Sequence, residues 1–76
     1  MRVVERLGWD PGEKRFTVGG CGIHCGTCVE IWFLGKWREV SFELSCSRRG
    51  TGWYFIMDRR ALSADDWLGA KVRADI

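Results

Sequence analysis

The sequence predicts an all-β fold, a small SH3-like barrel of five to six strands with one short helical turn. Three observations predict it: short segments rich in β-branched and aromatic residues, turn residues between them, and a single segment with helix start and stop signals. The chain has 76 residues, which is room for one domain, residues 1–76. Five Trp, four Phe and one Tyr supply the dense packing that a small core needs.

Turn chemistry sets the boundaries of the expected strands. Asp10-Pro11-Gly12 is a turn in which Pro presets φ and Gly accepts the left-handed conformation. The segment 19–26 holds four Gly in eight residues, so we expect a loop there, and a second polar loop at 45–52. Ser63 is expected to cap a helical turn that Gly69 ends. The expected strands are residues 2–7, 14–18, 27–34, 36–44, 53–57 and 70–74.

The clearest hairpin joins residues 27–34 to residues 36–44 across the short loop Leu34-Gly35. A two-residue loop would pair Trp32 with Trp37 and Val29 with Val40, so that apolar residues share one face. Both Trp side chains then fall on the opposite face of the hairpin.

The same register places Glu30 opposite Glu39, and like charges on facing strands are destabilising. We therefore expect a basic side chain from another strand, Arg15 or Arg73, to lie between the two carboxylates.

The face that carries Trp32 and Trp37 is the first candidate for a binding surface, with Arg38, Arg48 and Arg49 as further candidates. One interpretation is an open face that binds a partner protein. The other is that Trp9, Trp67 or the N-terminal hairpin covers it. Arginines beside aromatic rings also allow weak nucleic-acid binding, although a net charge of +2 does not by itself favour it.

The four cysteines give an alternative in which zinc stabilises the fold, with Cys21, Cys25, Cys28 and Cys46 as ligands. Three of them crowd into one segment and a second ligand pair is missing, so we expect no cofactor. In the simpler interpretation Cys25 and Cys28 pack as small apolar side chains and His24 makes a local hydrogen bond.

No catalytic motif is evident, and we expect a non-enzymatic module. An enzyme acting through Cys25 is the last alternative, because no third residue orients a Cys-His pair. No apolar run is long enough to span a membrane, and the N-terminus lacks the apolar stretch of a signal peptide, so we expect a cytoplasmic location with reduced cysteines.

Six short motifs lie along the chain: His24-Cys25-Gly26, Val29-Glu30-Ile31, Gly35-Lys36-Trp37, Phe42-Glu43, Gly52-Trp53-Tyr54 and Gly69-Ala70-Lys71-Val72-Arg73. Together they resemble a known family of small bacterial domains of unknown function, often encoded on conjugative or other mobile elements. The resemblance covers residues 8–74 and implies an accessory role in a mobile element, with no assigned activity. The chain departs from the family at the Leu34-Gly35 turn, where Asp-Gly or Asn-Gly is usual.

Overall fold

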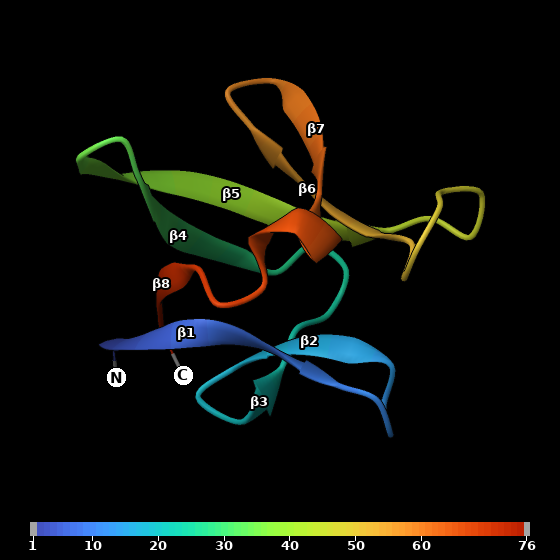
Figure 1. Ribbon diagram of the computed structural model, residues 1–76. Coiled ribbons are helices and arrows are strands. Elements are labelled where there is room, and N and C mark those ends of the chain that lie inside the picture. Colours follow the sequence, from blue (N-terminus) through green and yellow to red (C-terminus); the bar gives the residue numbers. More distant parts are fainter. Residues whose placement is uncertain (1, 76) are drawn as a thin grey trace.

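The computed structural model describes residues 2–75 and is built from eight β-strands and one single-turn 3-10 helix (Figure 1). Met1 and Ile76, the ends of the predicted domain, lie outside the described residues. No helix among residues 2–75 is long and apolar enough to cross a membrane. The strands are β1 (Arg2–Asp10), β2 (Arg15–Val18), β3 (Cys21–Gly22), β4 (Cys28–Phe33), β5 (Lys36–Leu44), β6 (Trp53–Met57), β7 (Arg60–Ser63) and β8 (Lys71–Asp75), and the 3-10 helix is η1 (Ala64–Trp67).

The strands form one antiparallel sheet in the order β3-β2-β1-β8-β4-β5-β6-β7, which confirms the all-β prediction. The predicted barrel is wrong in one respect, because the sheet is not closed. Closure requires the two edge strands to pair with each other. Here β3 has two residues and pairs with β2, while β7 lies at the other end of the strand order. The likeness to SH3 barrels is not confirmed.

Two strands that the sequence did not predict raise the number from six to eight. The first is β3, formed by Cys21 and Gly22 in the glycine-rich segment, which pairs with β2. The second is β7, which follows a two-residue turn at Asp58 and Arg59, with φ of 51° and 67°. Asp is common at the first position of such a turn, but Arg59 stands where Gly is usual, so the sequence predicts only the end of a strand here.

The β4–β5 hairpin has the predicted register. Trp32 pairs with Trp37 and Val29 with Val40, across a turn in which Leu34 and Gly35 have φ of 52° and 79°. Positive φ at both positions is typical of a type I′ turn, whose twist matches that of the strands.

The core lies between the β1–β2–β3 part of the sheet and the β4–β5–β6 part, which face each other in Figure 1. Alternate residues of each strand point into it, as period-2 patterning requires. Trp53 is 3% exposed and its indole N–H donates to the carbonyl oxygen of Lys14 at 3.0 Å, which satisfies the buried donor. Ser63 precedes η1 without a side-chain cap, and the Asp65 carboxylate accepts hydrogen bonds from Thr51 in the 45–52 loop. The largest fully buried side chains are Phe16, Phe42, Phe55, Leu7, Ile31, Val40 and Val72.

Candidate functional site

Trp32 and Trp37 form an aromatic pair on the outer face of the sheet, away from the core. Their ring centroids lie 5.3 Å apart with an interplanar angle of 73°, an edge-to-face arrangement. The Trp32 side chain is 42% exposed and Trp37 is half-buried. The face that carries the pair is therefore open to solvent at Trp32 and partly covered at Trp37.

Two of the three predicted covers, Trp9 and Trp67, lie elsewhere, and the third, the N-terminal hairpin β1–β2, continues the same sheet beyond β8. Trp9 packs against Phe16, with ring centroids 4.9 Å apart, and Phe16 belongs to the core. Trp67 contacts Phe33 and Phe55 at centroid distances of 5.1 and 5.4 Å. Both residues pack on the inner side of the sheet, so neither shields the outer Trp pair.

Strand β8 brings two cations to the Trp pair. Lys71 Nζ lies 5.5 Å from the Trp32 ring centroid and 6.0 Å from that of Trp37. The Arg73 guanidinium carbon lies 4.5 Å from the Trp37 centroid. All three distances are within the range of cation–π attraction. We call these four residues (Trp32, Trp37, Lys71 and Arg73) the Trp face.

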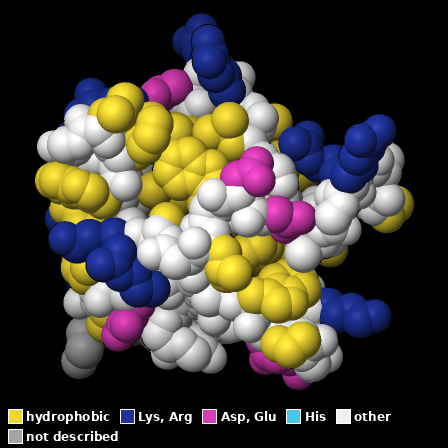
Figure 2. All heavy atoms as spheres, in the orientation of Figure 1, with side chains coloured by type: hydrophobic (Ala, Val, Ile, Leu, Met, Phe, Trp, Pro, Cys, Tyr) yellow, Lys and Arg dark blue, Asp and Glu magenta, His cyan; other side chains and the backbone are white. Residues whose placement is uncertain are grey.

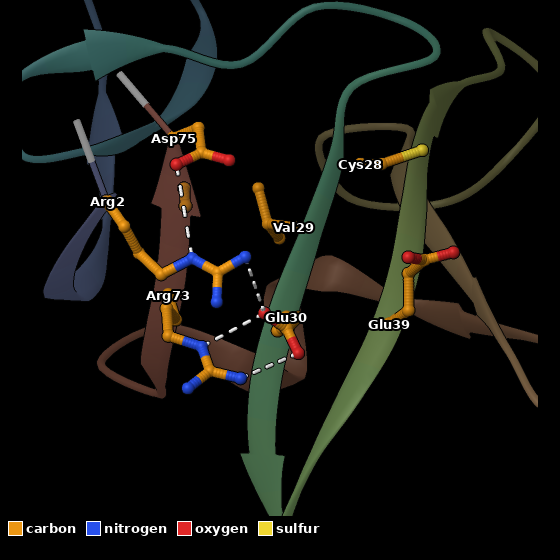
Figure 3. Close-up of a pocket in the computed structure, with 8 residues that line it drawn as sticks. Arg2, Cys28, Val29, Glu30, Glu39, Arg73 and Asp75 are labelled. Atoms are coloured by element: carbon orange, nitrogen blue, oxygen red, sulfur yellow. Dashed lines mark hydrogen bonds and ion pairs between the residues drawn. The ribbon is translucent and has the colours of Figure 1, made fainter.

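Arg73 is the basic side chain that lies near the facing glutamates, Glu30 and Glu39. Its Nε and Nη2 donate to the two carboxylate oxygens of Glu30 at 2.9 and 2.8 Å, a bidentate pair. Figure 3 shows Arg73 and Arg2 on one side of Glu30 and Glu39 on the other. The expectation of Arg73 near a glutamate is confirmed, but the guanidinium lies beside Glu30 and not between the two carboxylates. Arg15 is elsewhere, bonded to the Ile23 carbonyl oxygen and to His24 Nδ1.

The ion pair fixes the charge state of Glu30. The hydrogen bonds from Arg73 are the largest effect and lower the pKa of Glu30 below its ordinary value of 4.5. Desolvation by burial opposes them, and the positive charges of Arg73 and Arg2 add to the lowering. The same hydrogen bonds raise the pKa of Arg73. Arg73 is therefore held in place by two contacts at once, the Glu30 carboxylate and the Trp37 ring.

The three candidate arginines are not gathered at the Trp pair. Arg38 follows Trp37 by one residue, so its side chain lies on the inner face, where it donates to the Phe33 carbonyl oxygen and to Asp58. The 45–52 loop carries Arg48 and Arg49, and the Arg48 guanidinium lies 4.6 Å from the Tyr54 ring centroid. Tyr54 pairs with Glu43, six residues along β5 from Trp37, which is a separation of about 20 Å.

The cysteines are all exposed and free in the described structure. Cys25 and Cys28 are therefore not the small apolar packers at a strand entry that one interpretation predicted, whereas His24 does make the predicted hydrogen bond, with Arg15. Cys21 and Cys28 line the same shallow hollow, and Cys46 lies in the loop after β5. Within residues 2–75, no three His, Cys, Asp or Glu side chains are grouped closely enough to hold a metal ion.

Sequence reasoning missed Lys71 and the exposed turn residue Leu34. Lys71 reaches the Trp pair only because β8 pairs with β4, forty residues earlier in the chain, and such a pairing has no local signal. Leu34 lies at the tip of the β4–β5 hairpin, is 77% exposed and has a positive φ. The sequence predicts its turn, and the register places it two residues beyond Trp32, at the same end of the hairpin as the Trp pair.

A comparison with protein families gives one match, to a domain of unknown function (DUF5348), over residues 5–74. No curated protein and no solved structure shows significant similarity to the chain. The family model matches well over half of the sequence and spans all the strands that carry the Trp face. The chain therefore belongs to the DUF5348 family of domains of unknown function.

Proposed function

We propose that this chain is a non-enzymatic binding module that recognises a partner protein through the Trp face and the neighbouring hairpin tip at Leu34. The observation that carries the proposal is the edge-to-face Trp32–Trp37 pair, with Trp32 exposed, Trp37 half-buried and cations held against both rings. Trp and Arg are enriched at the centres of protein interfaces, where they account for much of the binding energy.

The backbone conformation of Leu34 supports the same interface, because it is energetically unfavourable in the isolated domain. A left-handed conformation costs an L-residue such as Leu about 1–2 kcal/mol, and Leu34 gains little packing in return since 77% of it is exposed. Strained residues of this kind concentrate at functional sites. A partner that covers the hairpin tip would bury this side chain together with Trp32.

On the β8 side of the Trp pair, the charges favour a partner that presents carboxylates there, whereas Glu39 and Glu43 lie on the β5 side. Arg6 pairs with Lys71 across β1 and β8, which places the two cations side by side. Among residues 2–75 neither of them takes part in an ion pair, whereas Arg73 is neutralised by Glu30. We expect an acidic and apolar protein segment to complement this combination of free cations and exposed Trp.

A nucleic acid fits the face less well. Sequence-independent binding of single strands needs aromatic rings on which bases can stack. The Arg73 guanidinium already lies over the Trp37 ring and is tied to Glu30, so a base would have to displace it. Glu39 and Glu43 also lie on β5 between the Trp pair and the arginine loop, which interrupts a continuous basic path.

The experiment is affinity capture from lysate of the native host, followed by binding of the purified partner. Trp32→Ala should abolish capture. Leu68→Ala should not, since Leu68 is an exposed apolar residue, 59% accessible, that borders the hollow near Trp9 on the other side of the sheet. A partner lost equally from both variants would contradict the proposal. A partner released by nuclease, with affinity falling steeply with salt, would favour nucleic-acid binding instead.

Two further expectations are part of the proposal. The resemblance to a family carried on bacterial mobile elements implies that the partner belongs to that machinery, and capture from a host with and without the element tests this. The fold is also expected to need no metal; zinc bound by the four cysteines is the alternative, and metal analysis of the purified protein distinguishes the two.

A further inference from the structure

A second concave site lies on the inner side of the β4–β5 hairpin, between that hairpin and the β6–β7 hairpin. It has a volume of about 450 Å³. Figure 2 shows hydrophobic side chains gathered between the two hairpins with charged side chains around them. We call it the inner recess; its apolar lining is Phe33, Met57, Leu62 and Trp67, and its charged lining is Arg38, Asp58 and Arg60.

The apolar floor of the inner recess is fixed before any ligand arrives. Trp67 packs edge-on against both Phe33 and Phe55, with centroid distances of 5.1 and 5.4 Å. Met57 is 6% exposed and belongs to the core. Preformed apolar walls with a few polar groups at the border are typical of small-molecule sites, whose volumes run from about 300 to 1,000 Å³.

The charges at the border sum to one positive charge. Arg38 Nη1 donates to Asp58 Oδ2 at 3.0 Å and its Nε donates to the Phe33 carbonyl oxygen, so the Asp58 carboxylate is already balanced. Arg60 pairs with Met57 in the sheet, which directs its side chain to the same face as the buried Met57. Within residues 2–75, Arg60 takes part in no ion pair.

We propose that the inner recess binds a small organic carboxylate with an aromatic or branched apolar body. The body lies on Phe33, Leu62 and Trp67, and the carboxylate accepts hydrogen bonds from the Arg60 guanidinium, a planar group suited to bidentate contact. This site is independent of the Trp face, because Phe33 and Trp32 point to opposite sides of β4.

The test is a titration of the ¹⁵N-labelled protein with indole-3-propionate, followed by NMR, with the neutral amide of the same acid as control. The acid should shift the Trp67 indole N–H and the backbone amides around Arg60 in a saturable way, with Kd on the order of 1 mM. The indole signals of Trp32 and Trp37 should stay in place. The amide should bind about tenfold more weakly, since it lacks the charge-assisted hydrogen bonds.

Two variants that each remove one positive charge distinguish binding at the inner recess from a general attraction of anions to the protein. Arg60→Gln should weaken acid binding about tenfold, whereas Arg49→Gln, in the exposed 45–52 loop, should leave it unchanged. Unchanged amide spectra elsewhere in each variant establish that both are folded. Equal affinity for acid and amide, equal loss in the two variants, or no saturable shift at Trp67 would overturn the proposal. Loss of the Trp-face partner leaves this result unaffected, so the two sites are tested separately.

Discussion

Replacing Leu34 by Asn should make the isolated domain more stable and its partner binding weaker. Asn tolerates the left-handed conformation far better than Leu, and Asn-Gly is a preferred sequence for this turn. Relief of the left-handed strain is worth about 1–1.5 kcal/mol. Leu34 is 77% exposed, so removal of its remaining contacts costs only about 0.5 kcal/mol.

The net expectation is a gain of about 0.5–1 kcal/mol in the free energy of unfolding, or a rise of roughly 2–8 °C in Tm for a chain of this size. Thermal and urea unfolding measure it. Leu68→Asn is the matched control, because Leu68 is 59% exposed with φ of −57° and has no such strain to relieve. If Leu34→Asn is destabilising, or if both variants change equally, the assignment of strain to the hairpin tip is wrong.

Three further predictions concern the ion pair, a turn and the cysteines. The lowered pKa of Glu30 contributes stability that is fully present above pH 4.5 and is lost as the pH falls through the lowered value, so Glu30→Gln should flatten the loss of stability measured by urea unfolding in acid. Gly52→Ala should destabilise by about 1–3 kcal/mol, because φ is 86° and the new Cβ would lie 2.7 Å from the Ser45 carbonyl oxygen; Gly35→Ala, with φ of 79° and open space, should cost less in the same assay. A chelator should leave Tm unchanged, and a marked fall would favour zinc bound by the cysteines.

Local patterns predicted the centre of the sheet well. The alternation from Val29 to Phe33 and the two-residue loop fix the β4–β5 register, because a shift of one residue would expose the apolar face. The same alternation could have excluded Arg38 from the Trp face, since it follows Trp37 directly and must point to the other side.

The features that could not be predicted from the sequence depend on contacts between segments that are distant in the chain. Whether Trp32 is open to solvent depends on where β1, β8 and η1 pack, and no local pattern encodes that. In the turn at Asp58 and Arg59, Asp is a usual first residue but Arg stands where Gly is expected, so the signal for β7 and the inner recess was weak. Closure into a barrel likewise depends on how the two sheet edges meet, which strand prediction does not address.

The central claim is that the exposed indole pair, with cations held against it, is where a protein partner binds. Calorimetric titration of the purified partner against the unmodified chain and Trp32→Ala tests it most directly, with both proteins shown to unfold at similar temperatures. We predict that Kd rises at least about thirtyfold, as expected for a residue at the centre of an interface. An unchanged Kd in a folded Trp32→Ala variant would contradict the claim.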